Sequence, residues 1–395
     1  SVGAEVNTIS GDLNINGITS NFNYGSHATN TFIGGKINIS AGAVCLSKMP
    51  GDLTANINGD VIISGGTLAL KCATGKADVT FKKNFIQSGG NFYLHNNSSA
   101  STPDVIGLII EGIFTQLNGI FNFDDNATST AAHTLTVKGS QFNVAGSGKI
   151  TKGGNGSSTV FGIIHYAAQG VMSYARTGAS QIMEQVKQII FSGCTLDVTA
   201  GNFQLSSHTS SNELLSIKNN ATLNMRSAQI VSNAQFSQTG FKAEAGGKII
   251  TANANGFYNS QNTATVSSSN GMTFNLDELS WVEYNGAANQ VLTSANATNQ
   301  KYGVLRINFQ GVVDVNFVQL NADVFVRKQL ILEKGELNLN NNTLTVESNA
   351  ATAIVKNNGY IKAEKSASSV KIKTVATGTT YVIPFGYNSS KSIPV

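Results

Sequence analysis

The stretch from Asp60 to Leu70, DVIISGGTLAL, contains the pattern that decides the fold. Val61-Ile62-Ile63 is a short β-branched run, Ser64-Gly65-Gly66 is a tight turn, and Leu68-Ala69-Leu70 begins a second apolar run. Short apolar runs bounded by Gly-containing turns are typical of β-strands. The stretch therefore predicts two short strands joined by a sharp corner.

The same unit recurs along the whole chain, as a small turn residue followed by alternating apolar positions. It begins at Gly35, Gly66, Gly90, Gly119, Ala221, Gly247, Gly335 and Gly359. Most recurrences lie roughly 21 to 34 residues apart, with a mean of about 27, and such a period indicates a stacked repeat. We expect an all-β, right-handed parallel β-helix (solenoid) of roughly 13–14 coils. A β-sandwich array, whose hairpins suit pairs such as Asn58-Gly59, is the alternative.

The composition agrees with a chain of many corners and few helices. The 395 residues include 40 Gly, 45 Asn, 20 Phe and only 12% charged residues, about half the usual charge content. Low charge and many aromatic residues exclude a disordered chain. Gly and Asn both tolerate the left-handed backbone region that sharp corners need. Asn side chains can in addition hydrogen-bond from rung to rung.

Charge and cysteine content limit the partners. The net charge is +4, but the cations are scattered, which argues against nucleic acid as a partner. No run of 18 apolar residues occurs in the sequence, so no membrane span is expected. Cys45 and Cys72 could lie on adjacent rungs and form a disulfide in an extracellular setting. Alternatively, they are two small buried residues stacked in the core.

Two segments break the rhythm and are expected to be loop excursions. One lies at residues 97–107 and the other at residues 166–190. In the second, apolar residues from Ile182 to Ile190 could form one short helix capped by Ser180, but an extended loop leading into a strand is the favoured interpretation. The candidate ligand contacts of the chain, Tyr166, Tyr174 and Arg176, lie in this segment.

A search for catalytic chemistry assigns no residue to catalysis, to a cofactor or to a metal. No histidine has metal-ligand spacing to another His or Cys; the five are His27, His95, His133, His165 and His208. A carbohydrate-active enzyme on this fold would need two carboxylates about 5 to 10 Å apart. Asp124-Asp125 precedes Asn126-Ala127-Thr128 and is interpreted as a solvated turn, and Asp277-Glu278 as a loop.

From about Gly246 onward, the order of the repeat pieces is distinctive enough to suggest a protein family. Gly246 to Asn253 is followed by Ser280 to Gln290, then by Tyr302 to Ile307, and the chain closes on Tyr381 to Gly386 and Ser392 to Val395. This succession resembles the repetitive β-rich surface proteins of Bacteroidetes that the type IX secretion system exports. The resemblance covers about 150 residues, implies secretion and surface display, and brings no catalytic residue with it. A C-terminal sorting domain normally follows in that family, so truncation at the C-terminus is expected.

These observations lead to one functional hypothesis. Residues 1–275 are expected to form the body of the β-helix, and residues 276–395 its continuing coils. The expected function is that of a secreted structural or adhesive protein of the cell surface, without enzymatic activity or cofactor. Its expected partners are further copies of itself, the type IX machinery during export, and surface glycans. A filament subunit that assembles end to end and a polysaccharide lyase or glycoside hydrolase are the alternatives.

Overall fold

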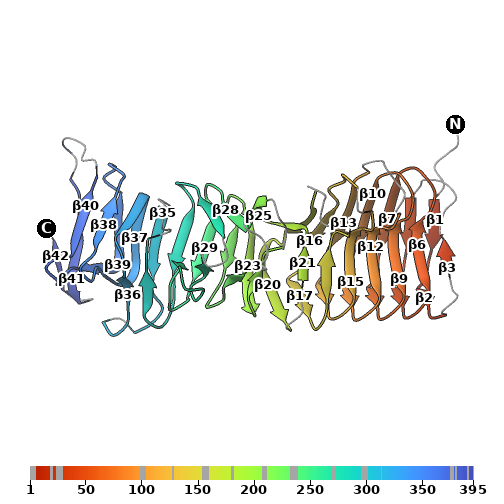
Figure 1. Cartoon of the computed structure of the whole chain (residues 1–395), viewed down its shortest axis with the longest axis horizontal. Helices are drawn as coiled ribbons and strands as arrows, with labels where there is room; N and C mark the ends of the chain where they lie inside the picture. Colours follow the sequence, from red (N-terminus) through yellow and green to blue (C-terminus); the bar gives the residue numbers. More distant parts are fainter. Residues whose placement is uncertain are drawn as a thin grey trace. The chain divides into compact units, whose positions relative to one another are not determined.

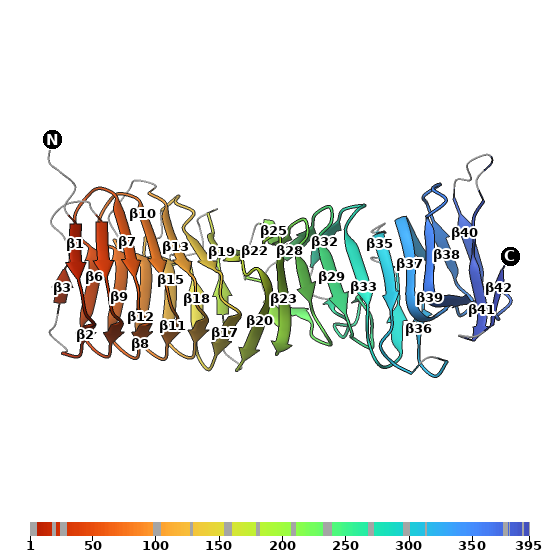
Figure 2. The ribbon, with the colours of Figure 1, turned by 180° about the vertical axis from the view of Figure 1, so that it is seen from behind.

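The chain is a parallel β-solenoid of about 13 turns, as the period predicts, and the β-sandwich alternative is wrong. The computed structural model describes residues 6–17, 21–23, 30–97, 104–126, 129–153, 160–178, 182–206, 211–231, 239–267, 272–294, 301–312, 314–373, 378, 380–388 and 391–394. Strands of successive turns lie side by side in the same direction within each part of the chain (Figure 1, Figure 2). The described residues divide into unit 1, as far as Leu214, and unit 2, from Leu215 onward.

Three parallel sheets, A, B and C, make up the turns of unit 1. In order of pairing, sheet A contains β1 (Val6–Ile9), β4 (Asn30–Ile33), β7 (Leu53–Ile57), β10 (Ala77–Phe81), β13 (Ile106–Ile110), β16 (Thr134–Val137), β19 (Gly162–Tyr166) and β22 (Val186–Ile190). Sheet B contains β2 (Leu13–Ile15), β5 (Ile37–Ile39), β8 (Val61–Ile63), β11 (Phe85–Gln87), β14 (Phe114–Gln116), β17 (Gln141–Ala145), β20 (Gly170–Thr177) and β23 (Cys194–Ala200). Sheet C contains β3 (Asn21–Asn23), β6 (Ala43–Ser47), β9 (Thr67–Lys71), β12 (Asn91–His95), β15 (Ile120–Asp124), β18 (Lys149–Thr151) and β21 (Ile182–Glu184). The short strand β24 (Phe203–Gln204) follows, and β25 (Ser211–Ile217) contains the boundary residue.

Unit 2 continues the parallel pairing with longer and less regular strands. Its principal series is β26 (Thr222–Asn224), β29 (Lys248–Thr251), β33 (Trp281–Tyr284), β35 (Tyr302–Asn308), β37 (Val324–Asn338), β39 (Ile354–Lys362) and β41 (Pro384–Asn388). Beside it lie β34 (Gln290–Leu292), β36 (Phe317–Leu320), β38 (Thr343–Val346) and β40 (Ser369–Ile372). The remaining strands are β27 (Ile230–Val231), β28 (Thr239–Ala243), β30 (Tyr258–Asn259), β31 (Val266–Ser267) and β32 (Thr273–Leu276). The last strand, β42 (Lys391–Pro394), pairs with β41 in the antiparallel sense.

The core of unit 1 consists of columns of equivalent residues stacked from rung to rung. Ile37, Val61, Phe85, Phe114 and Phe142 occupy one register position of sheet B, and none of them is exposed. The rings of Phe85, Phe114 and Phe142 stack in sequence, with centroids 5.2 and 4.6 Å apart. This position alternates with partly exposed neighbours, since successive side chains of a strand point to opposite faces.

The corners explain part of the Asn and Asp content. At several of them, a side-chain oxygen accepts the backbone N–H of the next rung. Lys36 N donates to Asp12 Oδ1, 24 residues earlier, and Ile113 N donates to Asn84 Oδ1, 29 residues earlier. The predicted hydrogen bonding of Asn between rungs is therefore confirmed. A corner backbone would otherwise leave N–H groups without a ladder partner.

The second predicted loop excursion is wrong. Within residues 166–190, β20, β21 and β22 take regular places in sheets B, C and A, so this segment is an ordinary turn of the solenoid. The short helix considered there is also wrong for the described residues, and Ser180 lies outside them. Most of the first excursion, residues 97–107, also falls outside the described residues. The described part of the chain contains no helix that is long and apolar enough to span a membrane.

Candidate functional site

A column of buried polar residues runs along one edge of sheet C in unit 1. Ser47 pairs with Lys71, Lys71 with His95, and His95 with Asp124, so these four residues share one register position. All four are at most 6% exposed. Each is the last residue of its strand, β6, β9, β12 or β15. We call these four residues the polar column.

Lys71 is the lysine of the polar column, and none of its surface is exposed. Its Nζ donates to Ser47 Oγ at 2.9 Å and to the carbonyl oxygens of Met49 and Gly51, both at 2.7 Å. Burial lowers the pKa of the Lys71 ammonium, and the carboxylates of Asp104 and Asp52 act in the opposite direction. Three acceptors match the three donors of an ammonium group, so the buried charge is fully hydrogen-bonded.

A disulfide lies beside this cation. Cys45 in β6 is bonded to Cys72, which directly follows Lys71, with their Cα atoms 6.4 Å apart. The separation along the chain is 27 residues, so the bond joins one rung to the next. The structure therefore contains the disulfide, and the alternative of two unbonded cysteines stacked in the core is wrong.

Asp124 is the centre of a second group, the histidine–aspartate cluster of His95, Asp124 and His133. His95 Nδ1 lies 2.9 Å from Asp124 Oδ1, and His133 Nε2 lies 3.1 Å from Oδ2. Burial by itself raises the pKa of Asp124, but hydrogen bonds from His133, His95, Ser129 and Asn126 outweigh it and hold the pKa well below its ordinary value. Asp124 is thus a buried carboxylate stabilised as the anion, and its interpretation as a solvated turn is wrong.

The cluster has the composition of a metal site, but its hydrogen bonds do not fit a cation. Its ligand-type atoms lie within 4.8 Å of one another. However, the backbone N–H of Ile106 donates to His133 Nδ1 at 3.0 Å. A neutral imidazole has one N–H, so the proton of His133 must be on Nε2, where it points to Asp124. A metal ion could bind Nε2 only if that nitrogen were unprotonated. The proton of the neutral imidazole would then be on Nδ1, where it would face the N–H of Ile106.

The electrostatics agree with a neutral His133. Burial lowers its pKa, and the attraction of Asp124 is the main opposing effect. The nearby Lys152 is 1% exposed, and its Nζ donates to the carbonyl of Ser129 at 3.0 Å. The cluster therefore contains one buried anion, held by hydrogen-bond donors that include the neutral His133, beside a buried cation. This arrangement fixes the ends of β12, β15 and β18 rather than presenting reactive groups.

Two of the three ligand contacts predicted in residues 166–190, Tyr166 and Tyr174, are wrong. Tyr166 and Tyr174 are both 0% exposed. The ring of Phe142 packs against both, at centroid distances of 5.1 and 5.9 Å, and the Tyr166 hydroxyl donates to Gln188 Oε1 at 2.7 Å. The two tyrosines extend the aromatic core because β19 and β20 occupy the sheet A and sheet B places of their turn, and neither can reach an external ligand. Arg176, on β20, is partly buried.

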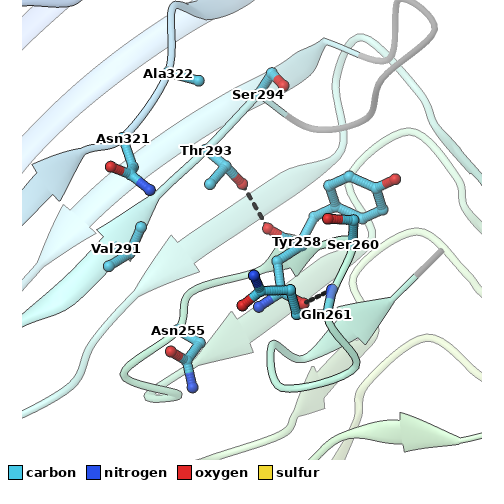
Figure 3. Close-up of a pocket in the computed structure, with 10 residues that line it drawn as sticks. Asn255, Tyr258, Ser260, Gln261, Val291, Thr293, Ser294, Asn321 and Ala322 are labelled. Carbon is cyan, nitrogen blue, oxygen red and sulfur yellow. Dashed lines mark hydrogen bonds between the residues drawn. The ribbon is translucent and has the colours of Figure 1, made fainter. Parts of the chain in front are cut away.

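A surface pocket of about 400 Å³ lies in unit 2, far along the sequence from the predicted contacts. Figure 3 shows it between the segment around β30 and the segment that follows β34. Its lining includes Asn255, Tyr258, Gln261, Val291, Thr293 and Asn321. The described residues that line it have amide, hydroxyl or apolar side chains, and none carries a charge. We call this the amide pocket.

Three further carboxylates that an enzyme could use are engaged in other contacts. Glu283 pairs with Arg306 at 3.1 Å and accepts from Asn308 at 2.8 Å, and Glu111 pairs with Lys82 at 3.0 Å. Asp277 Oδ1 accepts the N–H of Leu279 within its turn. These bonds give each carboxylate a structural role.

One pair of carboxylates does meet across rungs in unit 2. Asp314 Oδ1 and Glu336 Oε2 lie 2.8 and 2.9 Å from the hydroxyl oxygen of Tyr360. Burial raises the pKa of Tyr360, and its hydrogen bonds to the two carboxylates raise it further. The phenol thus occupies the space between the acids, where a hydrolase would place a glycosidic oxygen or water.

Sequence reasoning missed the polar column, although a signal was present. When the coils are aligned on their third strands, AVCLS, TLALK, NFYLH and IFNFD all end on a polar residue. No protein-family model matches this chain, and neither does any curated protein or solved structure.

Proposed function

We propose that this protein is a secreted, surface-displayed β-solenoid with a structural and adhesive role and without enzymatic activity. The observation that carries the proposal is the disulfide between Cys45 and Cys72. Disulfides persist in oxidising compartments and are rare in the cytosol, so the bond supports a location outside it.

The surface chemistry supports an adhesive role. Only 12% of the residues are charged, and the corners expose amide NH2 groups such as that of Asn118, whose oxygen alone is engaged between rungs. A rigid array of neutral donors and acceptors can make many weak hydrogen bonds to a polar surface. Export by a type IX system in Bacteroidetes is part of the same proposal and rests on the resemblance of residues 246 to 395.

Two measurements on cells that produce the protein test this proposal. Intact cells are labelled with an antibody to the chain, and the native protein is digested without reduction and analysed by mass spectrometry. We expect surface labelling and a disulfide-linked peptide pair that contains Cys45 and Cys72. Labelling only after cell lysis, together with two free thiols, would refute the proposal.

A carbohydrate-active enzyme is the second candidate, because Asp314 and Glu336 approach one hydroxyl group. Its test is the release of reducing ends from a panel of polysaccharides by the wild-type protein and by Glu336→Gln. Turnover that the substitution abolishes would favour the enzyme over the adhesive protein. Equal release by both proteins, or none, would count against this candidate.

A further inference from the structure

We infer that the amide pocket of unit 2 is a binding site for a neutral saccharide, a mono- or disaccharide unit of a surface glycan. This inference rests on the proposed adhesive function and gives it a location and a ligand class. It is carried by three properties of the pocket, namely a fixed frame, unused polar groups, and a lining without charge.

The frame of the pocket is held by hydrogen bonds between its two walls. Val291 N donates to Ala254 O at 2.9 Å, and Thr293 Oγ1 donates to Tyr258 O at 2.5 Å, a bond drawn in Figure 3. One wall is further closed by Asn259, whose Oδ1 accepts the N–H of Gln261 at 3.1 Å. A pocket whose walls are bonded in this way is formed before the ligand arrives, which lowers the entropic cost of binding.

Several polar side chains of the lining are available to a ligand. Within the described part of the chain, the side-chain amides of Gln261 and Asn321 make no hydrogen bond, and neither do the hydroxyls of Ser260 and Ser294. Each amide offers both donors and an acceptor. Sugar hydroxyls likewise donate and accept, so amides and hydroxyls are complementary to them.

The rest of the lining defines the ligand class more narrowly. Tyr258 and Val291 supply apolar surface, and Tyr258 is held in place by packing on Phe274 at a centroid distance of 5.7 Å. Apolar surface beside polar groups suits the mixed faces of a pyranose ring. The described lining has no cation to pair with a sulfate, phosphate or carboxylate, so anionic sugars gain nothing over neutral ones. The volume of about 400 Å³ falls in the usual range for small-molecule sites, roughly 300–1,000 Å³.

The test uses the whole chain and free sugars as probes. Saturation-transfer NMR and calorimetric titration are performed with neutral hexoses, N-acetylhexosamines and their disaccharides, and with glucuronate and inorganic sulfate as anionic comparators. A small polar ligand in an open pocket binds weakly, so we expect a dissociation constant of about 1 mM. The double variant Gln261→Ala/Asn321→Ala should weaken binding at least about tenfold.

Asn349→Ala is the matched control, because Asn349 is an exposed asparagine of the same unit outside the lining. It should bind like the wild type, and circular dichroism should show the same fold for all three proteins. Absence of saturable binding to every neutral sugar, binding that survives the double variant, or a preference for glucuronate or sulfate would each overturn the inference. Saccharide binding by a protein that is found only inside cells would instead refute the proposed function and leave the pocket assignment standing.

Discussion

The histidine–aspartate cluster gives a prediction that depends on the position of one proton. Asp124→Asn keeps the size of the side chain but replaces one acceptor oxygen by an NH2 group. The N–H groups of His95 and His133 point to opposite carboxylate oxygens, so with both histidines in these tautomers the new amide directs N–H at N–H in either orientation. His133 cannot relieve this by changing tautomer without confronting the N–H of Ile106.

The expected cost is large because the group is buried. Breaking a buried, hydrogen-bonded charge costs about 3 kcal/mol or more, which is about 6–12 °C in the melting temperature of a domain of this size. Asp125→Asn is the matched control, since it makes the same charge change at the adjacent, exposed residue and should shift the stability by less than about 0.5 kcal/mol.

Two optical signals separate the units in this experiment. The single tryptophan, Trp281, lies in unit 2, so its fluorescence reports that unit, whereas far-ultraviolet circular dichroism reports both units. Asp124→Asn should move part of the dichroism transition to a lower urea concentration. The urea concentration of the fluorescence transition should not change. Equal stability of Asp124→Asn and Asp125→Asn would refute the assigned hydrogen-bond pattern.

The histidine–aspartate cluster also determines how the stability of the fold changes with pH. The folded pKa of Asp124 lies below the ordinary value of 3.8, so its contribution is present above that pH and is lost as the pH falls below it. The folded pKa of His133 lies below the ordinary value of 6.5, so the unfolded chain binds the proton first and stability already declines below about pH 6.5. In Asp124→Asn, the loss below about pH 4 should be smaller than in the wild type.

Three further predictions concern the core of unit 1. Reduction of Cys45–Cys72 should lower the stability by about 2–4 kcal/mol, measured as the urea midpoint with and without dithiothreitol, and an unchanged midpoint would contradict a formed bond. Lys71→Met should cost about 1–3 kcal/mol, because it leaves the buried Ser47 hydroxyl and two partly buried carbonyls without their donor, whereas Lys48→Met, at an exposed position, should have little effect in the same assay. Phe114→Ala should cost about 3–5 kcal/mol by opening a cavity in the aromatic stack, and a loss below about 1 kcal/mol would show that the stack is not continuous.

Much of the fold could be predicted from the sequence because strands, corners and period are local properties. The alternation in Val61 to Leu70 and the recurrence of such units indicate the solenoid without knowledge of any contact. The error at residues 166–190 has a physical cause. The sheet B strand of this turn, β20, has eight residues, against three in β11 and β14, so its corners depart from the spacing on which the prediction depends.

The candidate sites could not be predicted in the same way, because they depend on register. His95 and His133 come together through Asp124, and only the pairing of β12 with β15 brings His95 beside it. The amide pocket depends likewise on how the segment around Tyr258 packs against Thr293. Neither the offset between rungs nor the path of a loop follows from composition.

The corner hydrogen bonds have a consequence for how this chain can change in length. From Asp12 to Lys36, from Asp52 to Lys76 and from Asp60 to Asn84, the offset is the same 24 residues. A deletion of one complete coil in this region would join residues that occupy equivalent positions in their coils, so each side chain would keep the same kind of neighbour. A deletion of one residue would instead turn every following side chain of the strand to the opposite face. The natural length variants of this part of the chain should therefore differ by whole coils of about 24 residues, and recombination between coils is the simplest route to them.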